Sequence, residues 1–160
     1  MAHIYMKDRE DLSGFFCCDC PSIRFVGRWG ITRDRAVTTT PGAYFEFAFR
    51  GNWATLQFDT TWQNSPMPHL WISVDDGAMV ETQLDRYLRI DALDEGDHVG
   101  RVIFKSANEM AHRWYTPLGG SVEFLGYKAR QAASLPPDTR KRIEFVGDRK
   151  STRLNSSHQA

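Results

Sequence analysis

The sequence has little of two features that often reveal function directly, net charge and long apolar runs. Its 160 residues contain 20 Lys and Arg against 20 Asp and Glu, so the formal net charge is zero. Proteins that bind nucleic acids or membrane surfaces through general basicity need a positive face, and this balance argues against both partners. No run approaches the roughly 20 apolar residues that span a bilayer. Charges from Lys7 to Asp11 stand where a signal peptide has its apolar core. We therefore expect a cytoplasmic protein, or a secreted one if the start codon is misassigned.

Cysteine is scarce and clustered, with Cys17, Cys18 and Cys20 as its three occurrences. Three thiols within four residues do not readily pair with one another, and no distant partner exists for a disulfide. A structural zinc site takes four ligands, usually as two separated pairs. Even with His3 as a fourth ligand the spacing is unlike that of zinc sites. We expect reduced thiols near a strand, with no metal and no cofactor.

The motifs of self-contained catalysis are missing as well. The sequence has no Gly-x-Ser-x-Gly elbow to expose a nucleophilic serine and no glycine loop that would cradle a phosphate. His69 follows a proline, His98 opens a predicted strand after a turn, and His112 precedes Arg113. None has a visible partner motif, so we interpret all three as turn or packing residues rather than general bases.

Alternating apolar residues, by contrast, are abundant. Residues 44–50 place three phenylalanines on one face, with Glu46 and Arg50 on the other, which is the period of a half-buried strand. Gly51 and Asn52 follow, and residues 53–59 alternate again. A two-residue loop that begins with glycine between alternating runs predicts a type II′ β-hairpin.

Further strands are expected at similar spacing, over 70–74, 87–90, 98–105 and 122–127, with one or two more within 23–31. No segment has the pattern of a long amphipathic helix. The sequence therefore predicts an all-β fold, a jelly-roll β-sandwich over residues 22–130, preceded by an N-terminal segment over residues 1–21.

The pattern changes after residue 130. Residues 131–141 contain paired prolines and no apolar period, as a linker between domains would. Residues 142–148, Arg-Ile-Glu-Phe-Val-Gly-Asp, then have the composition of a buried strand that ends in a tight turn. Such a strand has no use as the last element of a sandwich. We interpret it as the first strand of a second, α/β domain that is missing from this chain.

Residues 142–148 resemble the first catalytic block of the SGNH/GDSL hydrolases, and more closely that of carbohydrate esterase family 2. Other matching segments occur in the same order along the sandwich, at 25–29, 49–51, 74–77, 96–98, 113–115 and 122–126. The resemblance implies an N-terminal jelly roll before a catalytic domain that removes acetyl groups from hemicellulose-type sugars or oligosaccharides. In this family a serine in a Gly-Asp-Ser block attacks the ester, backbone amides help to hold the oxyanion, and a histidine from a later Asp-x-x-His block is the base.

The sequence departs from the family at the decisive position. Gly147 and Asp148 match the start of the Gly-Asp-Ser block, but Arg149 follows where the serine belongs. The run from Asp148 to His158 reads, codon by codon, as one frame of a common short-read sequencing adapter. We therefore interpret residues 149–160 as adapter-derived, against the alternative of a natural polar tail. This chain has no predicted catalytic residue and is expected to be inactive alone.

Three tryptophans are candidates for carbohydrate binding. Trp53 and Trp71 fall opposite the apolar alternation of their strands, and Trp62 follows two threonines in a predicted loop. Sugar rings present C–H faces that stack on exposed indoles. The same side chains would equally cover the sandwich or pack against a missing catalytic domain, because buried aromatics dominate core and interface energetics.

Three functions follow from these observations. The first is an accessory domain of an acetyl esterase, whose partner is acetylated carbohydrate reached through the missing domain. The second is a free-standing carbohydrate-binding module, and the third is an interaction or oligomerisation domain without a ligand. The strand expected at 142–148 favours the first. The sequence leaves the sugar and the oligomeric state open.

Overall fold

The computed structural model describes residues 3–6, 14–63, 65–92, 94–107 and 118–143, and within them every regular element is a β-strand. The strands, in chain order, are β1 (His3–Met6), β2 (Phe15–Phe16), β3 (Ile23–Val26), β4 (Gly30–Ile31), β5 (Ala36–Thr38), β6 (Tyr44–Phe58), β7 (His69–Val74), β8 (Val80–Gln83), β9 (Tyr87–Asp91), β10 (Asp97–Ser106) and β11 (Val122–Ala132). Every pairing is antiparallel. The all-β sandwich prediction is therefore confirmed. No helix long and apolar enough to cross a membrane occurs in these residues.

Strand β6 replaces the predicted hairpin at Gly51 and Asn52, and that prediction is wrong. Residues 44–58 form one continuous strand, in which Gly51 has a φ of 118°. The neighbours change at this glycine: β10 pairs with residues up to Arg50, whereas β9 pairs from Trp53 onward. Glycine followed by a polar residue marks a bend within a strand as well as a hairpin turn.

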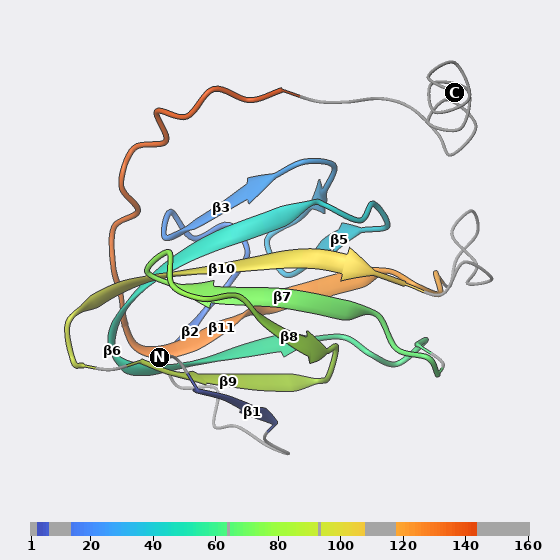
Figure 1. The fold of residues 1–160 in the computed structure, drawn as a ribbon, viewed down its shortest axis with the longest axis horizontal. Coiled ribbons are helices and arrows are strands. Elements are labelled where there is room, and N and C mark those ends of the chain that lie inside the picture. Colours follow the sequence, from blue (N-terminus) through green and yellow to red (C-terminus); the bar gives the residue numbers. More distant parts are fainter. Residues whose placement is uncertain (1–2, 7–13, 64, 93, 108–117, 144–160) are drawn as a thin grey trace, which may run out of the picture.

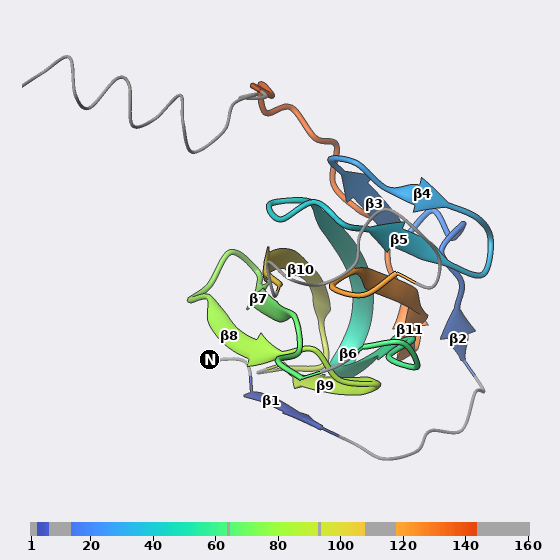
Figure 2. The same cartoon turned by 90° about the vertical axis from the view of Figure 1, so that its right-hand side faces the viewer.

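Because β6 bends, the sheet folds over itself into two layers (Figures 1 and 2). Layer 1 contains β3, the first half of β6, β10, β7 and β8. Layer 2 contains β1, β9, the second half of β6 and β11. Strand β11 also pairs with β2 and with β5, and β5 pairs with β4. The layers face each other across the core, and their outer faces are available for function.

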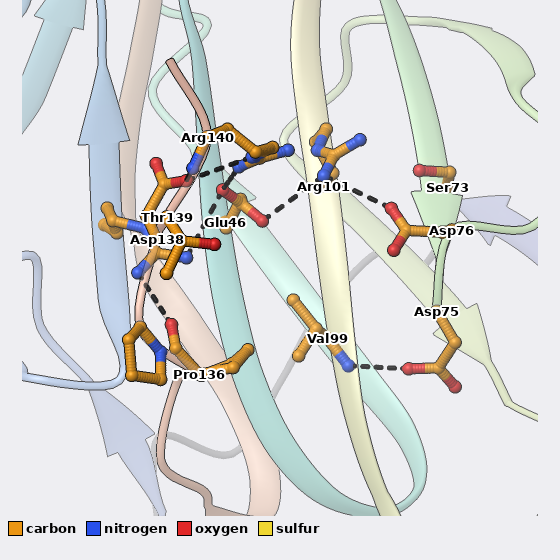
Figure 3. Close-up of a pocket in the computed structure, with 12 residues that line it drawn as sticks. Glu46, Ser73, Asp75, Asp76, Val99, Arg101, Pro136, Asp138, Thr139 and Arg140 are labelled. Carbon is orange, nitrogen blue, oxygen red and sulfur yellow. Dashed lines mark hydrogen bonds and ion pairs between the residues drawn. The ribbon is translucent and has the colours of Figure 1, made fainter. Parts of the chain in front are cut away.

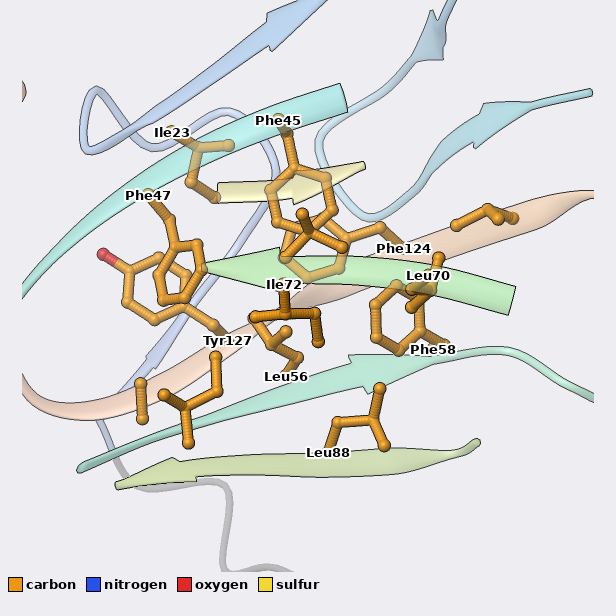
Figure 4. Packing of buried hydrophobic residues seen from close by; sticks show 14 of the residues in the cluster. Ile23, Phe45, Phe47, Leu56, Phe58, Leu70, Ile72, Leu88, Phe124 and Tyr127 are labelled. Carbon is orange, nitrogen blue, oxygen red and sulfur yellow. The ribbon is translucent and has the colours of Figure 1, made fainter. Parts of the chain in front are cut away.

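The core is rich in stacked aromatic rings contributed by both layers (Figure 4). Phe45, from layer 1, stacks on Phe124, from layer 2, with ring centroids 4.1 Å apart. Phe47 lies 5.1 Å from the ring of Tyr127, and all four side chains are fully buried. Burying one such side chain contributes about 1.5–3 kcal/mol, so these contacts hold the layers together.

The sheet extends beyond the boundaries expected from the sequence. Strand β1 pairs with β9 and β2 pairs with β11, so the N-terminal segment contributes two strands before residue 22. At the other end β11 continues to Ala132, and the expected linker therefore begins two residues later than predicted. Residues 133–143, called the connector below, have no regular secondary structure. The strand expected at 142–148 lies largely outside the described residues, and its first two residues, Arg142 and Ile143, are not in a strand.

A polar groove between the connector and layer 1

The outer face of layer 1 carries a row of charged side chains placed by the strand register. Arg24 on β3 pairs with Glu46 on β6, and Glu46 pairs with Arg101 on β10. Arg101 in turn pairs with Ser73 on β7. In antiparallel strands, residues directly opposite each other share a face. The row therefore sets one carboxylate between two guanidinium groups.

Glu46 is the centre of this row and is buried, although the alternation of its strand puts it on the outer face. Its carboxylate lies 3.5 Å from a nitrogen of Arg24 and 3.5 Å from one of Arg101. A third guanidinium reaches it from the connector, since Nη2 of Arg140 lies 2.8 Å from Oε1 of Glu46. A buried charge is tolerated only when it is paired, and the three arginines supply that pairing.

The connector is fixed by further polar contacts along the same face (Figure 3). Arg24 donates to the carbonyl oxygen of Pro136 at 2.9 Å. Asp138 binds both Arg140, at 3.0 Å, and Arg142, at 2.7 Å. Hydrogen bonds from Arg142 and Arg140 hold the pKa of the Asp138 carboxyl well below its usual range. Arg24 and Arg140 therefore bind the connector to layer 1, whereas Asp138 pairs with residues of the connector itself.

Between the connector and β10 lies a groove of about 450 Å³. Its far wall is the turn after β7, where Asp75 accepts the Val99 N–H at 2.8 Å and binds Nδ1 of His98 at 2.6 Å. Asp76 from the same turn pairs with Arg101 at 3.2 Å. Nε of Arg24 and of Arg101 are buried without a hydrogen-bond partner in the described part of the chain. The groove is therefore polar, with both signs of charge and unpaired donors.

Beside the groove runs a second row with aromatic and apolar side chains. Tyr44 on β6 pairs with Ile103 on β10, and Ile103 pairs with Trp71 on β7. Trp71 is half-buried, and Nζ of Lys105 lies 5.2 Å from its ring centroid. Lys105 also binds Glu81 at 2.8 Å. Trp71 thus lies on an outer face, next to charged groups.

The other two tryptophan candidates lie elsewhere. Trp53 is on β6 in layer 2, where the guanidinium of Arg89 lies over its ring at 5.0 Å. Trp62 is 58% exposed and belongs to the turn after β6. The structure therefore does not bring Trp53, Trp62 and Trp71 together. Each occupies a separate surface of the sandwich.

Two of the candidate histidines lie in the described residues, and both bind acidic residues. His69 binds Glu81 at 2.9 Å, and His98 is held between Asp75 and the backbone carbonyl of Asp94, at 2.9 Å. Both rings bridge neighbouring elements. His112, Gly147 and Asp148 lie outside the described residues. No group of three or more His, Cys, Asp or Glu residues in the described ranges is placed to hold a metal ion.

Comparison with known proteins finds solved structures of similar fold. No sequence-family model and no curated protein matches the chain. Among solved structures, a family 2 carbohydrate esterase from Cellvibrio japonicus is similar, with a TM-score of 0.57 and 15% identity over 86% of this chain and 37% of that one. A family 2 carbohydrate esterase from Clostridium thermocellum in complex with cellohexaose has a TM-score of 0.51 and 19% identity over 74% of this chain and 35% of that one. An active-site mutant of a family 2 carbohydrate esterase from that organism has a TM-score of 0.51 and 18% identity over 74% of this chain and 34% of that one.

These likenesses show a shared fold. The chain spans about a third of the length of each esterase. The sequence predicted this fold through its alternating strands, but it did not reveal the groove. Glu46 and Asp138 lie far apart in sequence, and the outward position of Glu46 in the alternation gave no sign that the connector covers it.

Proposed function

We propose that this chain is the N-terminal accessory domain of an SGNH/GDSL acetyl esterase that deacetylates hemicellulose-type sugars or oligosaccharides by serine acyl transfer. The domain itself carries out no chemistry. Its part is to support the catalytic domain and to deliver the chain to it at a defined place, and its partner is acetylated carbohydrate reached through that domain.

The anchored connector is the observation that carries this proposal. Arg140 binds Glu46 of layer 1, Arg24 of layer 1 binds the carbonyl oxygen of Pro136, and Ile143 at the described end of the connector is 77% exposed. A segment that leads into a second domain is fixed by these contacts at the place where it leaves the sandwich. Less conformational entropy is then lost when the second domain packs against the sandwich. The fold shared with part of three longer esterase structures supports the same interpretation.

Hydrolysis of 4-nitrophenyl acetate tests whether the chain has chemistry of its own. We expect turnover no faster than the spontaneous reaction, because the described residues lack a nucleophile with a base and an orienting group. Ser151→Ala is the matched control, since Ser151 follows the Gly-Asp pair most closely among the serines. Turnover that Ser151→Ala abolishes would overturn the proposal.

Carbohydrate binding by the sandwich itself is a second candidate function. The row of Tyr44, Ile103 and Trp71 lies directly beside the polar groove. Saccharides combine apolar C–H faces with hydroxyl groups, and a site for them needs an apolar platform next to a few polar groups. Layer 1 has both on one face, in adjacent rows of the same strands.

Two variants separate this candidate from non-specific binding. We expect titration calorimetry with soluble cello- and xylo-oligosaccharides to give an affinity that Trp71→Ala lowers about tenfold or more, which corresponds to about 1.4 kcal/mol. Trp53→Ala removes the same side chain from the opposite layer and should leave the affinity unchanged. Equal losses for both variants, or no binding by the unmodified chain, would exclude a site on layer 1.

A further inference from the structure

The three cysteines lie on a pair of consecutive tight turns before β3. The N–H of Cys20 donates to the carbonyl oxygen of Cys17 at 3.0 Å, and the N–H of Ile23 donates to that of Cys20 at 3.0 Å. A β-turn brings the Cα atoms of its first and fourth residues within about 7 Å. Disulfides span Cα–Cα distances of about 4.4–6.8 Å. The first turn therefore places Cys17 and Cys20, a Cys-x-x-Cys pair, within the range that a disulfide bridges, although their spacing in the sequence argued against pairing.

Cys18 is set apart from this pair. It is 3% exposed, and its Sγ donates to the carbonyl oxygen of Phe124 at 3.3 Å. Burial raises the pKa of the Cys18 thiol to about 12, with a smaller contribution from the neighbouring Cys17. Because the thiolate is the reactive form, Cys18 is inert. Cys17 and Cys20 are both partly exposed.

A cavity of about 400 Å³ gives access to Cys20. Its walls include Pro21, Ser22 and the first residues of the connector, and Arg50 lies at its edge. Sγ of Cys20 lies 3.1 Å from Oγ of Ser22. The cavity is large enough for a small disulfide molecule to approach this sulfur.

Hydrogen bonds through Ser22 connect Cys20 to the core. The hydroxyl of Ser22 lies 2.6 Å from that of Tyr127, which donates to the backbone carbonyl of Ala48 at 2.7 Å. This chain of hydrogen bonds links the turn to both layers of the sandwich. A change in the state of Cys20 therefore alters a contact at the start of a buried network.

We propose that Cys17 and Cys20 form a thiol–disulfide exchange site for low-molecular-weight disulfides of the glutathione class. The thiolate of Cys20 attacks one sulfur of the small disulfide, and the first small thiol leaves. The thiolate of Cys17 then attacks the sulfur of Cys20 in this mixed disulfide, and the second small thiol leaves. In total, two protein thiols and one small disulfide give one intramolecular disulfide and two small thiols. The protein loses two electrons and two protons, and the small disulfide gains them. This site is independent of the proposed esterase function.

Incubation of the full chain with oxidised glutathione tests the proposal. We expect intact mass spectrometry to show the loss of two hydrogens, and peptide mapping to place the bond between Cys17 and Cys20. Cys18 should then be the residue that iodoacetamide alkylates once the protein is unfolded. A bond to Cys18, a bond between two chains, or full retention of three thiols would overturn the proposal.

Three single variants assign the roles of the sulfurs. Cys18→Ser should still lose two hydrogens, because the pair is intact. Cys17→Ser should stop at the mixed disulfide and gain one glutathione at Cys20. Cys20→Ser should react at least tenfold more slowly, because the sulfur that faces the cavity is gone. Peptide mapping of the unmodified chain gives the answer even if a variant fails to fold. A Cys17→Ser variant that gains no glutathione while Cys20→Ser does would contradict the assigned order of attack.

Discussion

The core and the connector contact opposite faces of strand β6, but different forces hold them there. Phe45 and Phe47 point inward and are fully buried among aromatic rings from the other layer. Glu46 between them points outward and is buried by arginines and by the connector. The inner face depends on apolar burial, which the screening of charges by salt does not weaken. The outer face depends on ion pairs, which salt and charge substitutions weaken.

The aromatic contacts of the core therefore stabilise the fold of the sandwich, whereas the ion pairs of Glu46 position the connector. Loss of the aromatic contacts should unfold the sandwich, whereas loss of the ion pairs should release the connector and leave most of the sandwich intact. Substitutions on the two faces of β6 can therefore test the account independently.

The largest effect is expected from Phe47→Ala. The ring of Phe47 fills the space over Gly100, where an added Cβ would clash with the ring. Truncation leaves a cavity and should cost about 3–5 kcal/mol of unfolding free energy, measured by urea denaturation. Ile143→Ala removes an exposed apolar side chain from the connector and should cost less than about 0.5 kcal/mol. Similar losses for both variants would mean that the connector belongs to the core.

Glu46→Gln should have a smaller effect on stability and a larger one on the connector. The substitution keeps the shape and removes the charge that Arg24, Arg101 and Arg140 share. Because these arginines are partly exposed, we expect a loss of about 1–3 kcal/mol rather than the full cost of a broken buried pair. Limited trypsin digestion after Arg140 should become several-fold faster.

The control for this variant is Glu95→Gln, which removes an exposed partner of Arg130. It should leave both the stability and the digestion rate as they are. If Glu46→Gln also left the digestion rate unchanged, the connector would not be held by Glu46.

A third prediction concerns pH. Burial opposes protonation of His98, but hydrogen bonds and negative charge from Asp75 and Asp94 outweigh it, so the pKa of His98 is raised above 6.5. The folded state then binds the proton more tightly than the unfolded state. The stabilisation is fully present below pH 6.5 and is lost as the pH rises through the raised pKa. The difference in unfolding free energy between the unmodified chain and His98→Gln should therefore shrink with rising pH. A difference that grows over this range would reverse the assignment.

The smallest effect is expected from Arg50→Ala. Arg50 binds Asp97 at 2.6 Å, but both side chains are more than half exposed. Exposed pairs contribute little because water and salt screen them. The thermal midpoint should stay within experimental error, and trypsin should cleave the connector at its usual rate. A clear fall in the midpoint would show that ion pairs away from Glu46 also support the fold.

Local patterns predicted the longer strands, but they missed β1, β2, β5 and β8, the bend in β6 and the groove. Alternation located β7, β9, β10 and most of β11, because each has one buried face. It failed at Gly51, where the same residues suit a hairpin and a bend, and only the pairing partners decide between them. It also placed Glu46 in solvent. The burial of Glu46 depends on Arg140, which lies 94 positions away, and no local period carries that information.

The destination of the connector is tested by amplifying and resequencing the source DNA across the codon for Gly147. The account predicts that the reading frame continues Gly-Asp-Ser and reaches an Asp-x-x-His block roughly two hundred residues later, as a complete SGNH domain requires. The connector would then lead from the sandwich into the catalytic domain. A frame that continues through Arg149, Lys150 and Ser151 to a stop codon would contradict the account, and carbohydrate binding on layer 1 would become the function to test.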